Sequence, residues 1–314
     1  MDRGRLTGLD ALRGVAALVV FLGHVGYLTG FFAIPASYLA VDFFFMLSGY
    51  VMARTYEHRL GDDLSAGAFL WLRLKRLWPV CAVGSALAIP LALLRPNPAL
   101  EIPLALLLVP TFTFGVLYPL NTPLWSIFFE LLANLMHGMV LRRISLGGVV
   151  IVAAVTCLAI AARTHSYDLG SHPRSFLYGL PRVLLPYSMG VWMWRKVRDH
   201  PPRMRPAWAV APVMVLAIFI FSAGPDGATR VAFVVIVCPL ALLGGLQWNA
   251  GKLGIIAGAL SFPLYAVHFP LLSRAAFYGQ SIWPAASLAI VSAALLAFAP
   301  KLARSVALMA KRAG

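Results

Sequence analysis

The stretch LRGVAALVVFLGHVGYL at residues 12–28 decides the fold, because its apolar run is interrupted by only one arginine, Arg13, and one histidine, His24. About 20 apolar residues in an α-helix cross the hydrocarbon layer of a bilayer, so this stretch predicts a transmembrane helix. Arg3 and Arg5 precede it, as basic residues precede the apolar part of a signal peptide. It lacks a clear cleavage site, and further apolar runs follow, so we expect an uncleaved first helix.

The rest of the chain shares this apolar character. Of its 314 residues, 61% are hydrophobic and 12% are charged, and the mean hydropathy is +0.83. Soluble chains carry about 25% charged residues, so this chain has too few to cover a water-soluble globule. The composition therefore indicates a polytopic membrane protein. In such a protein the net charge of +15 is explained by cytoplasmic loops, and we expect no nucleic-acid partner.

Eleven apolar runs are candidates for membrane crossing, and the basic residues between them decide which ones cross, since loops rich in Lys and Arg stay in the cytoplasm. If all eleven crossed, the basic segments 142–143 and 195–205 would lie outside. If 102–117 does not cross, both lie inside with the basic 54–77 segment and the basic C-terminal end. The eleven runs are 12–28, 39–53, 78–94, 102–117, 123–141, 146–162, 176–194, 207–223, 229–246, 255–273 and 282–300.

We therefore predict an all-α fold, a polytopic helical bundle of about ten transmembrane helices with both termini in the cytoplasm. The segment 102–117 is predicted to be re-entrant or interfacial at the outer face, where Pro103, Pro110 and Pro119 suit a broken helix. The sequence contains no long linker and no convincing internal repeat. We expect residues 1–314 to form a single domain.

Ionisable side chains inside the predicted spans are the first candidates for a functional site, because buried charge in a membrane is costly and usually faces a cavity or a partner. His24 and Asp42 lie near the outer ends of the first two spans, and Glu130 lies nearer the midplane. Arg182 and His268 lie in the 176–194 and 255–273 spans. A lone histidine near a helix end is often only structural, bonded to a carbonyl.

Three arginines form a second candidate group. Arg13 shares a helix face with His24 and lies about 16 Å below it, and Arg73 and Arg76 share a face because they are three residues apart. Together they can form an inner basic pocket for phosphates, since guanidinium groups offer paired donors. A simpler interpretation is that Arg73, Lys75 and Arg76 contact lipid headgroups.

Other familiar chemistry is absent from the sequence. Cys81, Cys157 and Cys238 lie in apolar runs and are expected to be small buried residues. There is no Gly-x-Ser-x-Gly nucleophile motif and no His-Glu-x-x-His metal motif, so we expect no metal site.

Five motifs, taken in order along the chain, resemble the acyltransferase-3 family of integral membrane acyltransferases. The resemblance extends over most of the chain, and its weight comes from the order of the motifs more than from any single one. The motifs are LDALRGVAALVVFLGH (9–24), VDFFFMLSGYVMA (41–53), RLKRLWP (73–79), PLWSIFFELLANL (123–135) and SFPLYAVHFPL (261–271).

This resemblance implies transfer of an acyl group, acetyl or succinyl, from cytoplasmic acyl-CoA to a hydroxyl of a glycan or glycolipid at the bacterial inner membrane. The chain resembles the stand-alone form of the family, frequent in exopolysaccharide and Nod-factor modification. Acetyl-CoA is the expected co-substrate, and no permanently bound cofactor is implied. The expected partners are the donor, the glycan acceptor and membrane lipid, with a homodimer left open.

The resemblance also implies roles for individual residues. Arg13, Arg73 and Arg76 would bind the phosphates of CoA. His24 would act as general base with Asp42 orienting its other ring nitrogen, and an acyl-histidine intermediate is the alternative.

The remaining candidates are less closely defined. Glu130 would be a second orienting carboxylate or the partner of Arg182. Candidates for substrate contact or support are Arg182, His268, Trp125 and Ser126.

Two other functions fit the same charges. A transporter or flippase would use them as a proton relay, but such proteins often contain repeated halves, and none is visible in the sequence. A non-catalytic scaffold of a glycan-assembly complex would use them only to hold helices together. Both alternatives rank behind acyl transfer because the placement of the polar residues and the family resemblance point to it independently.

Overall fold

The computed structural model describes residues 4–113, 115–199, 206–224 and 226–313, and only the backbone of 300–313. Within these ranges the protein is all-helical, and the only β-pairing is an isolated bridge between Leu60 and Leu64. The predicted all-α fold is confirmed. Residues 200–205 of the basic loop and the basic side chains at 301–312 lie outside the described part.

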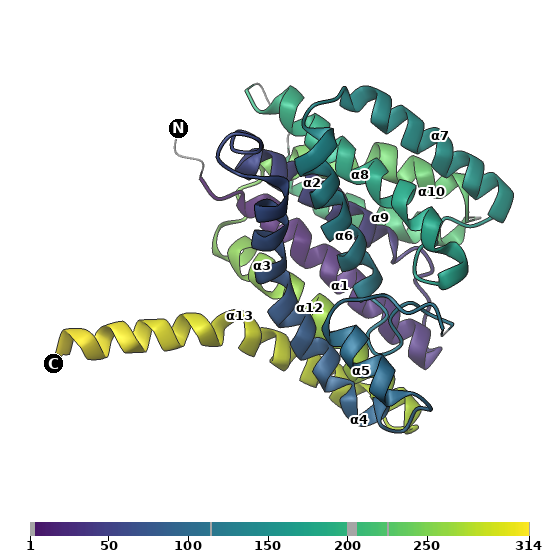
Figure 1. Ribbon diagram of the computed structural model, residues 1–314, viewed down its shortest axis with the longest axis vertical. Coiled ribbons are helices and arrows are strands. Elements are labelled where there is room, and N and C mark those ends of the chain that lie inside the picture. The colour runs from purple at the N-terminus through teal and green to yellow at the C-terminus, as the bar shows by residue number, and fades with distance from the viewer. Residues whose placement is uncertain (1–3, 114, 200–205, 225, 314) are drawn as a thin grey trace.

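The last turns of α13 extend away from the bundle (Figure 1). Pro79, Pro181, Pro186, Pro263 and Pro270 lie within helices, where each removes one backbone hydrogen bond. The helices are α1 (Thr7–Thr29), α2 (Leu39–Tyr56), α3 (Ala66–Leu87), α4 (Ile89–Ala92), α5 (Pro98–Leu106), α6 (Leu124–Met136), η1 (His137–Leu141), α7 (Leu146–Thr164), η2 (Pro173–Ser175), α8 (Phe176–Val197), η3 (Ala207–Ala209), α9 (Val210–Ala223), α10 (Ala228–Ala232), η4 (Phe233–Val237), α11 (Cys238–Gln247), α12 (Gly251–Phe277) and α13 (Ile282–Ala313).

Six helical segments in the described ranges are long and apolar enough to cross a membrane. The helices α2, α3 and α8 are 18 to 22 residues long, but each contains charged residues, among them the buried Asp42, Arg73 and Arg182, which lower its hydropathy. The protein is thus a helical membrane protein. The six segments are Thr7–Thr29, Leu124–Leu141, Leu146–Thr164, Ala228–Gln247, Gly251–Phe277 and Ile282–Ala299.

The third helix begins earlier than the apolar run predicted. The run starts at residue 78, whereas α3 starts at Ala66, where the Ser65 hydroxyl accepts a hydrogen bond from the Ala68 amide at 3.2 Å. A serine N-cap of this kind starts a helix irrespective of hydropathy. Arg73 and Arg76 therefore lie inside α3 instead of in the preceding loop, so they are held on a rigid element.

The described part of 102–117 contains no membrane-length helix. It begins within α5, which has nine residues and is about 14 Å long. The chain then turns at Leu108, which has a positive φ of 57°. This turn is fixed by Tyr118, whose hydroxyl donates to the Leu108 carbonyl at 2.8 Å. The described part therefore lacks the helix of about 20 residues that crosses a bilayer.

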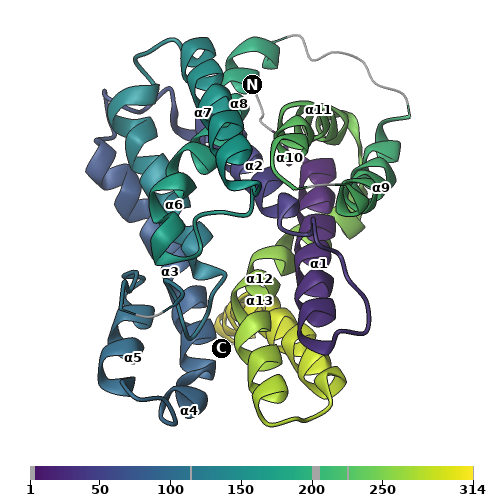
Figure 2. The ribbon, with the colours of Figure 1, turned by 90° about the vertical axis from the view of Figure 1, so that its right-hand side faces the viewer.

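Two helix pairs run parallel and form the centre of the bundle. The helices α1 and α12 lie side by side (Figure 2), with Gly14 against Ala257 and Gly258 against Asp10. Small residues at these crossings let the backbones approach closely, as in other membrane bundles. We call the end of the bundle where α1 begins the Thr7 end and the opposite end the Thr29 end.

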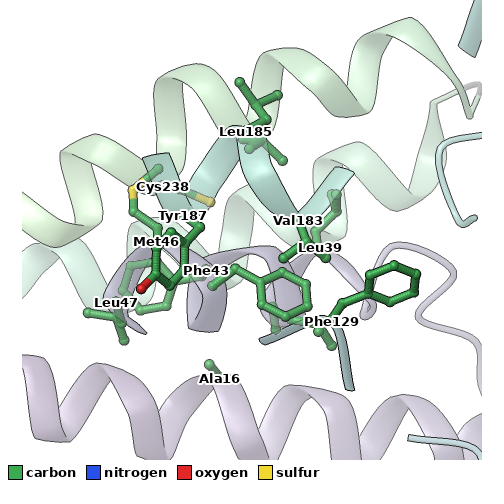
Figure 3. Packing of buried hydrophobic residues seen from close by; sticks show 14 of the residues in the cluster. Ala16, Leu39, Phe43, Met46, Leu47, Phe129, Val183, Leu185, Tyr187 and Cys238 are labelled. Carbon is green, nitrogen blue, oxygen red and sulfur yellow. The ribbon is translucent and has the colours of Figure 1, made fainter. Parts of the chain in front are cut away.

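The second parallel pair, α2 and α8, packs as closely. A Cβ atom at Gly49 would collide with the Tyr187 carbonyl, and one at Gly190 would collide with the Met46 carbonyl. Around this crossing, side chains from α1, α2, α6, α8 and α11 form one buried core (Figure 3). Its labelled members are Ala16, Leu39, Phe43, Met46, Leu47, Phe129, Val183, Leu185, Tyr187 and Cys238.

Candidate active site

A cavity of about 110 Å³ lies between α1, α2, α3, α6 and α12. Arg13 of α1 and Arg73 and Arg76 of α3 all line it. Each lies six to ten residues from the start of its helix, about 9–15 Å along the axis from the Thr7 end. The structure thus brings the three predicted arginines into the wall of one cavity.

One carboxylate lies among these arginines. Glu130 of α6 accepts a hydrogen bond from Arg73 at 2.8 Å and another from the Ser48 hydroxyl at 2.7 Å. The Arg73 side chain is only 6% exposed, and its Nε has no hydrogen-bond partner in the described ranges. Asp10, which is outside the cavity lining, lies 3.8 Å from Arg13 Nη1. Three guanidinium groups against these two carboxylates still leave a net positive charge, and one buried donor is unpaired. Such a site favours an anionic ligand.

The side of the cavity formed by α6 and α12 carries two neutral hydroxyl groups. Ser126 of α6 and Tyr265 of α12 are buried, and their oxygens are 2.7 Å apart. Both hydroxyls also lie within hydrogen-bond distance of the Pro123 carbonyl, at 2.9 Å and 3.2 Å. The cavity therefore has charged guanidinium groups and a separate pair of neutral donors.

Beyond Tyr265 lies a pair of histidines. His268 is one helical turn further along α12, and its ring centroid is 6.0 Å from that of Tyr265. The Nε2 atom of His268 lies 3.2 Å from Nδ1 of His24 on α1. The two residues are 244 positions apart in the sequence and meet because α1 and α12 run parallel.

The contacts of the pair decide where its protons lie. Nδ1 of His268 lies 2.9 Å from the Leu264 carbonyl, and Nδ1 of His24 lies 3.0 Å from the Val20 carbonyl. A carbonyl can only accept, so in the neutral rings both Nδ1 atoms carry the hydrogen. The single Nδ1 hydrogen of His24 is then shared between the Val20 carbonyl and Nε2 of His268, which accepts. As a result, Nε2 of His24 carries a lone pair that no described residue binds.

The structure separates Asp42 from this pair and places it with Arg182. Asp42 accepts hydrogen bonds from Arg182 Nε at 3.4 Å and Nη2 at 3.3 Å, and from the Tyr167 hydroxyl at 3.3 Å. Arg182 Nη1 donates to Asp168 at 3.0 Å and to the Leu169 carbonyl at 2.8 Å. The expected contact between Asp42 and His24 is therefore replaced by the histidine pair.

Aromatic rings complete the surroundings of Arg182. Its guanidinium carbon lies 4.9 Å from the ring centre of Trp125, 5.0 Å from that of Tyr38 and 5.3 Å from that of Tyr167. These cation–π contacts compensate a buried arginine for lost hydration. Trp125 thus contacts Arg182, and the next residue, Ser126, faces the cavity. Glu130 bonds to Arg73 instead of to Arg182, which had been the expected alternative.

Comparison with known proteins identifies the family. A family model described as "Acyltransferase domain" (Acyl_transf_3) matches residues 6–301. The chain belongs to the acyltransferase-3 family. The predicted resemblance is confirmed, and membership supports acyl-group transfer at a membrane as the activity.

One relative of this acyltransferase carries little functional information. "Protein 2 in picA locus" from Rhizobium radiobacter is 33% identical over 175 residues, covering 48% of this chain and 91% of the relative. No solved structure matches the chain.

Sequence reasoning missed some residues of the acyltransferase site. Tyr265 could have been found, since it lies three residues before His268 in the quoted motif SFPLYAVHFPL. Ser48 lies in the quoted motif VDFFFMLSGYVMA but gives no signal of its own. Tyr167 and Asp168 come from a loop with no sequence signal at all, and only the fold brings them to Arg182 and Asp42.

A second polar cluster of the acyltransferase lies near the Thr7 end, away from the cavity. Glu57 follows the last residue of α2 and accepts a hydrogen bond from Arg195 Nε at 2.9 Å, with His137 Nε2 at 3.5 Å. Burial raises the pKa of Glu57, but the hydrogen bonds from His137 and Arg195 outweigh it, so the net pKa lies below its usual value. The cluster ties the end of α2, η1 and α8 together.

Acid should therefore destabilise the acyltransferase partly through Glu57. A carboxylate whose pKa is lower in the folded state stabilises the fold above the ordinary glutamate pKa of about 4.3, and this contribution is lost as pH falls through the folded-state pKa. We expect the melting temperature in detergent to fall less steeply below about pH 4 in Glu57→Gln than in the wild type. Asp62→Asn in an exposed loop is the control. Equal slopes in Glu57→Gln and the wild type would contradict this role.

Proposed function

We propose that this protein transfers a short acyl group from cytoplasmic acyl-CoA to a hydroxyl of a glycan or glycolipid on the outer side of the bacterial inner membrane. One observation carries the proposal. Three arginines line a cavity whose other side carries the hydroxyls of Ser126 and Tyr265, and the Tyr265 ring lies 6.0 Å from that of His268, which contacts His24. An anionic donor held by the arginines would therefore extend toward the histidine pair. Neither a phosphate site alone nor a histidine pair alone would favour this chemistry.

The sidedness of the proposal follows from charge. We infer ten crossings, with the Thr7 end and both termini in the cytoplasm, because this arrangement keeps the basic segments 54–77, 142–143 and 195–205 inside. The arginines of the cavity then face the compartment that holds CoA thioesters. His24 lies toward the outer face, because it is close to Thr29, the last residue of α1.

Donor binding rests on the arginines. Arg13, Arg73 and Arg76 would hold phosphate groups, and the unpaired Nε of Arg73 is a donor that such a ligand satisfies. Glu130 holds Arg73 in place and limits the excess positive charge. Acetyl is the first candidate for the acyl group and succinyl the second, as the family resemblance implies.

The chemical step uses His24 as a general base. Its free Nε2 takes the proton of the acceptor hydroxyl while that oxygen attacks the thioester carbonyl carbon. His268 accepts a hydrogen bond from Nδ1 of His24 and so holds the ring in the tautomer that leaves Nε2 unprotonated. When the carbon–sulfur bond breaks, the imidazolium returns its proton to the CoA thiolate. The products are an acyl ester and free CoA.

The function is tested by comparing a strain lacking the gene with one that carries it. Mass spectrometry of surface glycans should show one acyl mass that disappears in the deletion strain and returns on complementation. Inverted membrane vesicles from the complemented strain should also convert labelled acetyl-CoA or succinyl-CoA to free CoA and a labelled glycan. Glycan export without any acyl difference would favour a transporter, and equal acylation in both strains would contradict the proposal.

A further inference from the structure

Among the hydroxyl groups that line the cavity, those of Tyr265 and Ser126 have no assigned task. The third serine or tyrosine hydroxyl of the described lining, that of Ser48, already donates to Glu130 at 2.7 Å. Tyr265 and Ser126 are 6% and 3% exposed, yet both line the cavity. They are therefore shielded from bulk water and reachable by a ligand in the cavity.

The carbonyl of Pro123, which both hydroxyls approach, has more hydrogen-bond donors around it than it has lone pairs. The Pro123 carbonyl lies 2.9 Å from the Ser126 hydroxyl, 3.2 Å from the Tyr265 hydroxyl and 3.2 Å from the Ser126 amide. A carbonyl oxygen has two lone pairs, so three donors compete for two positions. One hydroxyl can turn to a ligand without leaving Pro123 unpaired. Since Ser126 is three residues from Pro123 on the same helix turn, Tyr265 is the donor freer to turn.

The position of Tyr265 relates this donor to the proposed chemistry. Tyr265 lies one turn from His268, which contacts His24. Its hydroxyl is a neutral donor, in contrast to the charged guanidinium groups that line the same cavity. Neutral donors held in a water-excluded site stabilise the negative charge that develops on a carbonyl oxygen, and they need no reorganisation to do so.

We propose that the Tyr265 hydroxyl, held by Ser126, donates a hydrogen bond to the thioester carbonyl oxygen of the acyl donor and stabilises the oxyanion formed on attack. This rests on the proposed acyl transfer. Attack of the acceptor oxygen on the carbonyl carbon moves the C=O π electrons onto oxygen, where Tyr265 stabilises the charge without losing its proton. Collapse restores the C=O bond, breaks the C–S bond and releases the CoA thiolate, which takes its proton from the His24 imidazolium.

Tyr265→Phe tests the proposal because it removes only the hydroxyl. We expect kcat for transfer from acetyl-CoA in inverted membrane vesicles to fall about 10²–10³-fold, with KM for acetyl-CoA nearly unchanged. The acetyl dithioester of CoA, whose C=S group is a poor hydrogen-bond acceptor, provides a second readout. With that donor, wild type and Tyr265→Phe should react at similar rates. An equal fall with both donors would overturn the proposal, since it would indicate a structural role.

The control is Tyr118→Phe. The Tyr118 hydroxyl is also buried and donates to a carbonyl, that of Leu108, but it does not line the cavity. We expect its kcat to stay near that of the wild type. Membrane abundance of each variant is measured by blot. If Tyr265→Phe does not accumulate in the membrane, Ser126→Ala is measured in its place. We expect kcat of Ser126→Ala to fall about 10-fold with acetyl-CoA and to change little with the dithioester.

The outcomes separate this inference from the proposed function. Wild-type vesicles that transfer no acyl group from any CoA thioester would refute the function, and the Tyr265 inference with it. Wild-type transfer with an unchanged kcat in Tyr265→Phe would refute the inference alone.

Discussion

Replacing His24 with alanine is expected to lower kcat for acyl transfer about 10²–10⁴-fold, the usual contribution of a positioned general base. KM for acyl-CoA should change little, because Arg13, one of the arginines that would bind the donor, lies about 16 Å away along α1. The expected loss follows from the contacts of His24, whose Nδ1 is held by Val20 and His268 while its Nε2 faces no described partner. The measurement is transfer of labelled acetyl from acetyl-CoA in inverted membrane vesicles.

Two further histidine variants serve as comparisons for His24→Ala. His268→Ala should give a smaller loss of kcat than His24→Ala, because Nδ1 of His24 keeps its hydrogen bond to Val20 at 3.0 Å. His58→Ala, in the loop after α2, should leave kcat unchanged. Wild-type kcat in His24→Ala at normal membrane abundance would remove His24 from the mechanism.

The same Nε2 could instead attack the thioester directly, and a quench experiment separates the two mechanisms. A general base leaves no label on the protein when acetyl-CoA is supplied without acceptor. A nucleophilic histidine would accumulate labelled acyl-enzyme under those conditions. Our proposal therefore expects no covalent label in the wild type, and label dependent on His24 would contradict it.

Local sequence signals predicted the features that depend on one helix. The apolar run at 12–28 lies within α1, and the runs 176–194 and 255–273 lie within α8 and α12. The spacing of Arg73 and Arg76 also placed both on one face of a helix, and the structure places them on one cavity wall. These features depend on periodicity and hydropathy, which a single sequence contains.

Features that depend on how the helices are rotated against one another could not be predicted from the sequence. His24 and Asp42 were expected at a similar depth, and depth alone suggested that they meet. The small-residue contacts of Gly14 and Gly258 instead press α1 against α12 and bring His268 to His24. The early start of α3 was missed because a run of basic residues hid a helix whose start is set by Ser65.

Replacing Asp42 with asparagine is expected to destabilise the protein by about 3 kcal/mol, the lower end of the cost of breaking a buried ion pair. Asparagine keeps the shape and one acceptor oxygen but removes the charge opposite Arg182, which is 2% exposed. Asp168 still neutralises part of that charge at 3.0 Å, which is why the lower end applies. The measurement is the melting temperature in detergent, with an expected fall of about 6 °C.

A second substitution distinguishes loss of charge balance from loss of packing. In Asp42→Asn combined with Arg182→Met, no buried charge is left unpaired, and the methionine sulfur can contact the rings of Trp125 and Tyr167 that surrounded the guanidinium. We expect the double variant to be more stable than Asp42→Asn alone, since apolar replacement of a buried pair is often neutral. Asp168→Asn is the control, with an expected cost of at most about 1 kcal/mol, because that side chain is 49% exposed. A double variant no more stable than Asp42→Asn would mean that Arg182 stabilises the bundle through its packing and not through its charge.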